Sequence, residues 1–380
     1  MIRKIAVNTG GGDAPGLNAV IRAVVLSAQQ RGWEVWGIRQ GYRGLIEEQE
    51  GGLIPLDRKA VRGITHLGGT ILGSTNRGDP FQYPRAVGGE LVPTDMSGKL
   101  IDRFKELGFD ALVAIGGDGS LRLAAKLLER GLPRVIGVPK TIDNDLAGTD
   151  VTFGFQTAVA TATDAIDKLH STAQAHERVM VVEVMGRYAG WIALHAGLAG
   201  TADAILIPEI EFDIERVCEK VRIREERGQP FSIIVVAEGA RPKGGTMQFR
   251  TQKGKFSEHA VLGGIAETVA QQIQELTGKE TRSLVLGHLQ RGGTPVASDR
   301  LLSLRLGAAA THYLAETNHS GMVSVHGLAL ELTPLEEVAG KVRTVPFDSD
   351  LLRTGRALGV CFGDEPEGAL RGAPPSVRLT

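Results

Sequence analysis

The sequence predicts an α/β protein of two domains with mostly parallel sheets. Its 380 residues exceed the length of one average domain. Apolar runs as long as a buried strand alternate with amphipathic helical stretches for most of the chain. Many of the 50 glycines directly follow these strand-like runs, and parallel sheets bind ligands at that point. The ligand sites are therefore expected beyond the carboxyl ends of the strands.

The individual elements follow from the apolar pattern. A continuous apolar run predicts a strand that is buried on both faces. Such runs occupy residues 5–8, 111–115, 135–138, 179–184, 204–207, 232–237 and 283–286. Apolar residues at helical spacing predict helices from Leu17 onward and at residues 100–107, 121–127, 214–227, 261–276 and 301–314. Glycine, proline and acidic residues dominate the end of the chain and predict a flexible tail over residues 361–380.

The overall composition indicates an ordinary globular protein, with 42% hydrophobic and 23% charged residues. A net charge of −1 gives no general basis for binding nucleic acid or an anionic membrane. The two cysteines, Cys218 and Cys361, lie too far apart for a metal-ligand pair and predict free thiols in a reducing compartment. No signal-peptide pattern or membrane-length apolar stretch occurs, so we expect a cytoplasmic protein.

The first glycine-rich segment, residues 9–18, joins the first strand to the first helix. Glycines there let backbone N–H groups face a phosphate, and the following helix adds a favourable dipole. The spacing matches neither the P-loop nor the dinucleotide fingerprint. This segment alone is equally consistent with a tight turn between strand and helix.

The second segment is Gly116-Gly117-Asp118-Gly119-Ser120, which follows the strand at 111–115. Its glycines allow close approach of a phosphate, and Asp118 can hold Mg²⁺ directly or through water. A simple N-cap at Ser120 is the structural alternative. Lipid kinases and NAD kinases share the Gly-Gly-Asp-Gly turn, so the segment indicates phosphoryl chemistry without identifying the acceptor.

The third segment, residues 139–145, follows the strand at 135–138 and combines a lysine, a threonine and two aspartates. In an extended stretch Asp143 and Asp145 project to the same side. One carboxylate could accept a proton from an attacking hydroxyl group while the other orients a neighbour or a metal. Lys140 and Thr141 come directly after a buried strand, which disfavours a merely solvated turn.

Six motifs in this order resemble the 6-phosphofructokinase family over roughly residues 1–357. They are Gly-Gly-Asp-Ala-Pro-Gly at 11–16, Gly-Gly-Asp-Gly-Ser at 116–120, Thr-Ile-Asp-Asn-Asp at 141–145, Met-Gly-Arg at 185–187, Glu-Gly at 238–239 and Gly-His-Leu-Gln-Arg-Gly-Gly at 287–293. The resemblance implies two Rossmann-like three-layer domains with the active site in the cleft between them. Residues 1–154 with about 290–342 would form the ATP domain, and 155–289 with about 343–360 the fructose 6-phosphate domain.

The resemblance also implies a reaction, the transfer of the γ-phosphoryl group of ATP to the 1-hydroxyl of fructose 6-phosphate. Asp143 resembles the general base, Thr141 a hydrogen-bond donor to the transferring group, and Asp145 an electrostatic orienting group. Arg77 resembles the arginine that neutralises charge on the transferred oxygens. The implied donor-binding residues are Gly12, Arg77, Asp118 with its Mg²⁺, Gly119, Ser120 and Lys140.

The implied sugar-phosphate site includes Glu238 for the sugar hydroxyls, and His288 and Arg291 for the 6-phosphate. Arginine forks suit a dianionic phosphate because they bind it bidentately. Arg178 and Arg282 resemble arginines that reach into the neighbouring subunit's site, which implies a homotetramer or a homodimer. The complete implied set is Thr141, Ile142, Asp143, Arg178, Met185, Gly186, Arg187, Glu238, Arg282, His288, Leu289, Gln290 and Arg291.

The phosphoryl donor depends on two positions that give mixed signals. Users of pyrophosphate in the family carry Asp at the position of Gly119 and Lys at that of Lys140, whereas common ATP users carry Gly at both. A carboxylate at position 119 would repel the α-phosphate of ATP, and its absence removes that barrier. A lysine can steady either donor. The sequence therefore favours ATP, with pyrophosphate as the alternative.

The sequence also bears on regulation and on the competing functions. Arg22 and Arg58 match an effector site of bacterial relatives, but Leu26 and His170 replace two of its arginines, so we expect weak or absent regulation of that type. A lipid or NAD kinase does not explain the motifs at 185–187 and 287–293. A nucleotide-dependent dehydrogenase would need an acidic residue closing the second strand and a hydride-transfer site, and the sequence shows no convincing match to either. An inactive sugar-phosphate sensor is disfavoured because the catalytic residues are intact.

Overall fold

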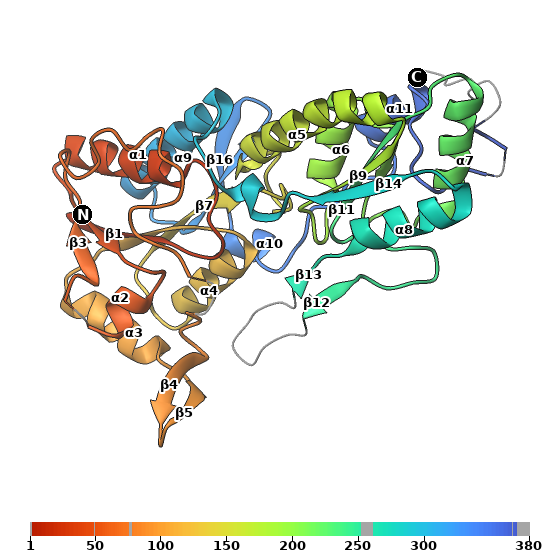
Figure 1. The fold of residues 1–380 in the computed structure, drawn as a ribbon. Helices are drawn as coiled ribbons and strands as arrows, with labels where there is room; N and C mark the ends of the chain where they lie inside the picture. Colours follow the sequence, from red (N-terminus) through yellow and green to blue (C-terminus); the bar gives the residue numbers. More distant parts are fainter. Residues whose placement is uncertain (1, 49, 76–77, 252–260, 367, 371–380) are drawn as a thin grey trace.

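Two sheets, each covered by helices on both faces, form two lobes (Figure 1). The computed structural model describes residues 2–48, 50–75, 78–251, 261–366 and 368–370. Among these residues no helix combines the length and the apolar character needed to span a bilayer. The predicted α/β class with mostly parallel sheets is confirmed. The domain boundaries stay a prediction.

The larger sheet has five parallel inner strands and antiparallel edge strands. Its order is β16 (Ala329–Thr333), β15 (Gly321–His326), β7 (Val135–Thr141), β6 (Ala111–Gly116), β1 (Lys4–Thr9), β2 (Glu34–Ile38) and β3 (Leu53–Pro55), with β8 (Phe153–Gly154) beside β7. After β1 the chain moves to one side through β2, and it returns on the other side at β6. Such a reversal between neighbouring strands opens the crevice where α/β sheets bind ligands.

Helices cover both faces of this sheet because successive strand side chains point to opposite faces. Val7 and Ile115 pack in the core beneath α1 (Leu17–Gln30) and α9 (Ala297–Glu316). Ala6 and Ala114 pack in the core beneath α3 (Ser97–Glu106) and α4 (Asp118–Glu129). Three shorter pieces complete the lobe, namely α2 (Arg43–Ile46), α10 (Leu335–Val338) and the projecting hairpin of β4 (Tyr83–Val87) and β5 (Glu90–Thr94), as Figure 1 shows.

The smaller sheet is entirely parallel, in the order β10 (Ala204–Leu206), β11 (Ser232–Ala237), β9 (Val179–Val184) and β14 (Thr281–Val285). Val182 and Val235 pack in the core with α5 (Phe155–His176) and α6 (Trp191–Ala199), and Val181 and Val236 pack with α7 (Ile214–Glu226) and α8 (Ile265–Thr277). The remaining elements are α11 (Asp350–Ala357) and the short antiparallel pair β12 (Phe249–Thr251) and β13 (Val261–Leu262).

One predicted helix begins later than expected. The apolar pattern predicts a helix from residue 261, but Val261–Leu262 pairs as β13 and α8 begins at Ile265. The cause is the glycine pair between them, since Gly263 and Gly264 adopt φ values of 137° and 94°. A helix cannot pass through these left-handed conformations.

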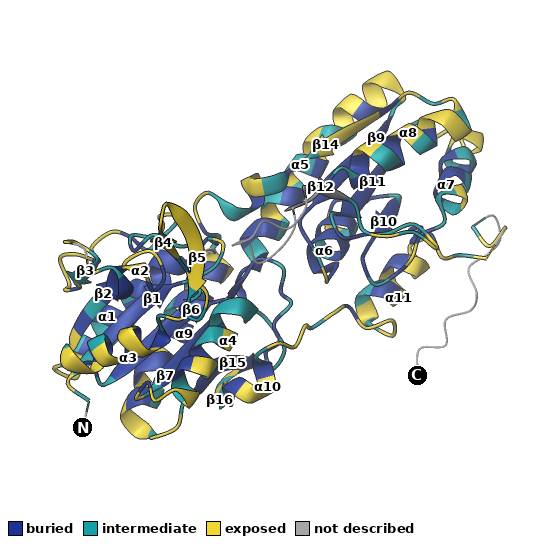
Figure 2. Ribbon diagram, turned by 90° about the horizontal axis from the view of Figure 1, so that it is seen from below, coloured by how far each residue is buried: buried dark blue, intermediate teal, exposed yellow. Residues whose placement is uncertain are grey.

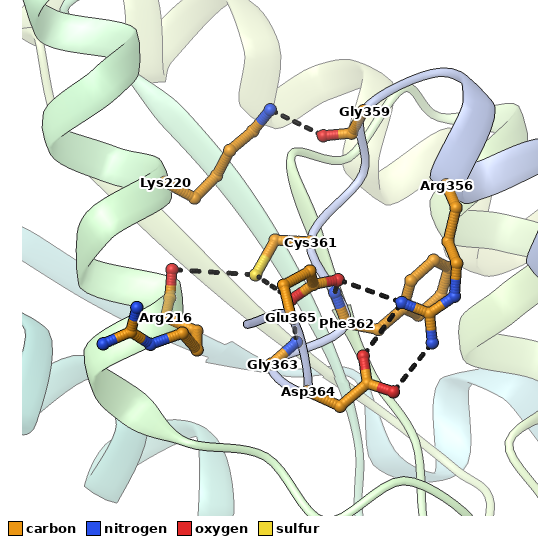
Figure 3. Close-up of polar contacts among 9 residues, drawn as sticks. All are labelled: Arg216, Lys220, Arg356, Gly359, Cys361, Phe362, Gly363, Asp364 and Glu365. Carbon is orange, nitrogen blue, oxygen red and sulfur yellow. Dashed lines mark hydrogen bonds and ion pairs between the residues drawn. The ribbon is translucent and has the colours of Figure 1, made fainter. Parts of the chain in front are cut away.

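The predicted tail is wrong for residues 361–365. Cys361 and Phe362 are fully buried, and the Cys361 backbone donates to Asp203 O and accepts from Ile205 N beside β10. The Glu365 carboxylate accepts from the backbone N–H groups of Phe362 (2.7 Å) and Gly363 (3.0 Å) and from the Cys361 thiol. Figure 3 shows Arg356 holding Asp364 with both of its terminal nitrogens. These contacts extend the second lobe beyond the last predicted strand.

Candidate active site

Three glycine-flanked strand ends meet at the reversal point of the larger sheet. Gly10 N donates to Ile115 O at 2.9 Å, which joins the loop after β1 to the end of β6. A Cβ on Gly10 would lie 2.6 Å from the Ser120 hydroxyl, and one on Gly116 would lie 2.2 Å from Ser120 Cβ. Only glycine fits at either position. The first two glycine segments therefore form one surface of backbone N–H groups and a hydroxyl.

Lys140 belongs to the same surface. Its side chain, 4% exposed, leaves the end of β7 and donates from Nζ to Gly12 O at 2.6 Å. Burial lowers the pKa of Lys140 to about 8, with a contribution from the nearby Arg291 charge, and the carboxylates of Asp143 and Asp145 oppose the shift. The lysine supplies a positive charge beside the glycine loop.

A pocket of about 330 Å³ opens at this loop. Its second wall is the segment 69–75, where Gly11 N donates to Thr75 O at 3.1 Å and the Ser74 hydroxyl donates to Gly11 O. The lining residues are Gly11, Gly12, Asp13, Gly69, Thr70, Ser74 and Thr75. Residues 69–75 were not among the predicted site residues, although their density of Gly, Ser and Thr was the available signal. Arg77 lies outside the described residues.

The N-terminus of α4 differs from the simple N-cap alternative. The helix begins at Asp118, its cap residue is Gly117, and Ser120 lies inside the first turn with no capping bond. The Asp118 carboxylate accepts from Gly340 N at 2.6 Å. Asp118 is therefore held at the edge of the loop by a backbone group that is 222 residues away in sequence.

The segment 141–145 turns back on itself instead of running extended. The Thr141 hydroxyl accepts from Asp143 N at 3.1 Å and donates to Asp145 Oδ1 at 3.1 Å. Asn144 adopts a left-handed φ of 54°, and its side chain accepts from Thr152 N at 3.0 Å. The turn brings the Asp145 carboxylate and the Asp143 backbone to the Thr141 hydroxyl, and the two carboxylates lie close enough to interact electrostatically.

Both carboxylates are better proton acceptors than ordinary aspartates. Burial raises the pKa of Asp143, against the lowering effect of Arg291. Burial and the neighbouring Asp143 charge raise the pKa of Asp145 to about 6. Asp143 Oδ1 is buried and has no hydrogen-bond partner among the described residues. An unpaired, desolvated carboxylate suits a general base, because it gains most from receiving a proton.

A second set of residues occupies the carboxyl ends of three adjacent strands of the smaller sheet. Met185, Gly186 and Arg187 follow β9, and Glu238 follows β11. The 3₁₀ helix η1 (Gly287–Arg291) follows β14. These are the sugar-phosphate residues that the resemblance implied, and the parallel order β11-β9-β14 brings them to one edge.

Close backbone packing fixes this second set. A Cβ on Gly239 would lie 2.0 Å from Arg187 O, and Gly239 N donates to Gly186 O at 3.1 Å. The buried Gln290 side chain accepts from Met185 N at 3.3 Å, which ties η1 to β9. Gln290 is a structural link in this arrangement. His288 and Leu289 are exposed.

The two sets are joined across the lobes. Arg291 Nη1 donates to Asp13 O at 3.2 Å. A Cβ on Gly12 would lie 2.9 Å from the same nitrogen, so the arginine packs directly against the glycine loop. Burial raises the pKa of Glu238, and the Arg187 charge opposes this shift. The charges of Glu238, Arg187 and Arg291 all act on Asp143. Asp143 therefore lies at the meeting point of both strand-end sets.

Arg178 and Arg282 are not part of this group. Arg178 directly precedes β9 and Arg282 is the second residue of β14, and both form ion pairs with Glu280 at this end of the strands (Arg178 Nε–Glu280 Oε2, 2.8 Å). The length of β9 separates Arg178 from Met185, and a six-residue strand spans about 20 Å. These two arginines cannot contact the same small molecule as Asp143 within one chain.

Strand-end glycines lie beside a buried lysine amine and a buried carboxylate, and a second set of strand-end residues lies across from them. This arrangement is typical of a two-lobed α/β enzyme of phosphoryl transfer. The family profile described as Phosphofructokinase matches residues 4–314. The chain belongs to the phosphofructokinase family.

Known proteins extend this assignment. An ATP-dependent 6-phosphofructokinase of Chloroflexus aurantiacus is 53% identical over 363 residues, covering 96% of this chain and 98% of the relative. A pyrophosphate–fructose 6-phosphate 1-phosphotransferase of Streptomyces coelicolor is 48% identical, covering 95% of this chain and all of the relative. The solved Pichia pastoris phosphofructokinase is 32% identical with a TM-score of 0.75, covering 89% of this chain and 35% of that longer one.

Proposed function

We propose that this chain transfers the γ-phosphoryl group of ATP to the 1-hydroxyl of fructose 6-phosphate, giving fructose 1,6-bisphosphate and ADP. The observation that carries the proposal is the position of Asp143 between the Lys140-anchored glycine loop and the set at 185–187, 238 and 287–291. Donor phosphates at the first set and the sugar phosphate at the second would bring the hydroxyl group to Asp143. Phosphoryl transfer needs little beyond such positioning and charge stabilisation.

Asp143 would take the proton of the attacking hydroxyl group. Its raised pKa favours this role over that of a passive charge. The Thr141 hydroxyl, shared between Asp143 N and Asp145 in this structure, would turn toward the transferring group. Lys140, Gly12, Gly119 and Ser120 would bind the donor, and Arg77 would balance the charge that develops on the transferred oxygens.

Mg²⁺ would be held by Asp118 together with oxygens of the donor phosphates. Among the described residues no group of three or more His, Cys, Asp or Glu side chains gathers in a way that could cage a metal. A single carboxylate plus substrate phosphates is a usual Mg²⁺ arrangement in kinases. The ion would neutralise phosphate charge during the transfer.

The choice of ATP rests on Gly119 at the start of α4. Both donor classes occur among similar proteins, since the Chloroflexus relative is named for ATP and the Streptomyces relative for pyrophosphate. A carboxylate at position 119 would occupy the space of the α-phosphate, and this chain has none there. Lys140 can hold the terminal phosphate of either donor.

The direct test is an assay of the purified protein with Mg²⁺, fructose 6-phosphate and either ATP or pyrophosphate. We expect faster turnover with ATP. Gly119→Asp should lower the ATP rate far more than the pyrophosphate rate, whereas Gly98→Asp, on the exposed start of α3, should change neither. Faster turnover with pyrophosphate contradicts the donor choice, and no turnover of fructose 6-phosphate with either donor contradicts the function.

Arg178 and Arg282 would complete the site of a neighbouring subunit, in a homotetramer or homodimer. Their distance from Asp143 within the chain supports this, and so does the exposure of β14, where Leu284 is 37% exposed. The predicted domains, residues 1–154 with about 290–342 and residues 155–289 with about 343–360, would each contain one of the two sheets. A cytoplasmic location agrees with the free thiols of Cys218 and Cys361.

A further inference from the structure

Residues 340–345 connect α10 of the larger lobe to the smaller lobe, and Figure 2 shows this connection running from α10 toward α11. At its start, Gly340 N donates to Asp118. At its end, Val345 is 1% exposed in the core of the smaller lobe, and its N–H donates to Glu209 at 2.7 Å. The connection is therefore fixed in both lobes.

Arg343 lies in the middle of this connection and contacts residues of both lobes. On the side of the larger lobe, Arg343 N donates to Asp145 O at 2.8 Å, and Nη1 donates to Asn144 O at 3.1 Å. On the side of the smaller lobe, the guanidinium lies 4.4 Å from the ring centre of Trp191. The Trp191 indole N–H donates back to Arg343 O at 3.1 Å.

The Trp191 side of this contact is itself rigid. Trp191 is the first residue of α6 and is 6% exposed. The Glu209 carboxylate accepts from Gly190 N at 3.1 Å as well as from Val345 N, so it holds the start of α6 and the connection together. A guanidinium stacked on an indole in such a partly buried place gains a cation–π attraction that a solvated pair would lack.

The Asn144 side of the contact bears on catalysis. Asn144 stands between Asp143 and Asp145 in an uncommon left-handed conformation. Its side chain is held within the larger lobe by Thr152, and its carbonyl group is held by Arg343. The peptide group next to the base is thus fixed by one contact inside its own lobe and one that leads to the other lobe.

We propose that Arg343 is a positioning residue that couples the base segment 143–145 to Trp191 of the smaller lobe. The inference rests on the proposed function only in so far as Asp143 is the base. Phosphate binding depends on other residues, so loss of Arg343 should affect the rate of transfer more than the binding of either substrate. The sugar-binding lobe would reach the base segment through this side chain.

The test compares Arg343→Met, which keeps an unbranched apolar stem and removes the guanidinium, with Arg343→Lys and with Arg353→Met on the exposed side of α11. We expect Arg343→Met to lower kcat about tenfold or more with both KM values within about twofold. Arg343→Lys, which keeps one donor for Asn144 O, should be intermediate, and Arg353→Met should equal the wild type. Equal kcat for the Arg343→Met and Arg353→Met variants, or a change in KM alone, overturns the proposal.

Hydrogen–deuterium exchange gives a second readout that is independent of activity. Exchange over residues 141–146 should be faster in Arg343→Met than in the wild type and unchanged in Arg353→Met. Trp191→Phe removes the indole donor, keeps an aromatic ring and serves as the test variant if Arg343→Met does not fold. We expect it to raise exchange over the same residues to a smaller degree. Unchanged exchange in the folded variants overturns the coupling. If the wild type does not turn over fructose 6-phosphate, the proposed function is wrong. The exchange data would still test whether Arg343 couples residues 143–145 to Trp191.

Discussion

The Lys140 ammonium, at the end of β7, donates to the carbonyl oxygen of Gly12, beyond the end of β1, at 2.6 Å. This contact places a buried positive charge inside a loop that otherwise consists of backbone groups. It crosses β6, which lies between the two strands in the sheet. The fold itself therefore holds a buried cation within the proposed donor site.

The pH dependence of donor use should follow from this burial. Burial lowers the pKa of Lys140 to about 8, so the ammonium loses its proton as the pH rises through that value. We expect kcat/KM for ATP to fall above about pH 8, because this ratio reports the free enzyme. Lys140→Met should have a low kcat/KM for ATP without this decline, while Lys105→Met, on the exposed face of α3, should keep it.

The same shift has a consequence for stability. The unfolded amine keeps its proton up to its ordinary pKa of 10.5, so the unfolded state binds more protons than the folded state between about pH 8 and that value. The cost of burying the charge is fully present below pH 8 and is relieved above it. The Lys140 contribution to the free energy of unfolding should thus rise with pH over this range. A wild type and a Lys140→Met variant with identical pH profiles would contradict the assignment.

Asp143→Asn should remove the base while keeping the size of the side chain. A general base contributes about 10²–10⁴-fold, so kcat should fall by that order with little change in KM. The melting temperature should stay equal or rise, because the buried Oδ1 has no partner among the described residues and burial already disfavours the charge. Asp167→Asn, on an exposed position of α5, is the matched control. A variant that retains more than about a tenth of kcat would show that another group takes the proton.

The end of the second lobe offers a prediction about stability. The Glu365 side chain is 10% exposed and accepts from two backbone N–H groups in addition to its ion pair with Arg356. The Asp364 side chain is 36% exposed and pairs with the same arginine. Hydrogen bonds to a buried charge are worth about 1.5–3 kcal/mol, and an exposed ion pair about 0–1 kcal/mol. Chemical denaturation should therefore show a larger loss for Glu365→Ala than for Asp364→Ala, with kcat unchanged in both. Equal losses would mean that Glu365 does not contribute more than Asp364 to the packing of residues 361–365 against the smaller lobe.

Subunit complementation tests the proposed role of Arg178. Arg178→Met should raise KM for fructose 6-phosphate about tenfold or more, since a charge-assisted bond to the phosphate is lost. Mixed oligomers of the Arg178→Met and Asp143→Asn variants should regain activity, because one site then receives an intact base and an intact neighbouring arginine. Mixtures of the Arg178→Met and Arg282→Met variants should not regain activity, because every subunit would then contribute only one of the two arginines to its neighbour's site. Mixed oligomers of the first kind that stay inactive would contradict a shared site.

Much of the fold was predictable where burial dictates the pattern. The strands at 179–184 and 232–237 agree residue for residue with β9 and β11, because a strand buried on both faces is largely apolar, with Glu183 and Ser232 as the polar exceptions. The helices α5 and α6 were not predicted. Each begins after a glycine without a side-chain cap, so neither carries a start signal. The helix α6 is buried along most of its length and has no one-sided stripe, and the buried face of α5 consists mostly of alanine and threonine.

The sequence alone determined the chemistry at the strand ends. The glycine segments, Lys140 and the two aspartates are adjacent in the chain to the strands that carry them, so local pattern was enough to place them at the edge of a parallel sheet. Only the tertiary structure decided which distant groups join them. The wall at 69–75, the contact of Arg291 with Asp13, the contacts of Arg343 with Asn144 and Trp191, and the pairing of Cys361 with Asp203 and Ile205 all depend on how separate elements pack. No local pattern encodes such contacts, because they join residues that are far apart in the sequence and meet only when the elements pack.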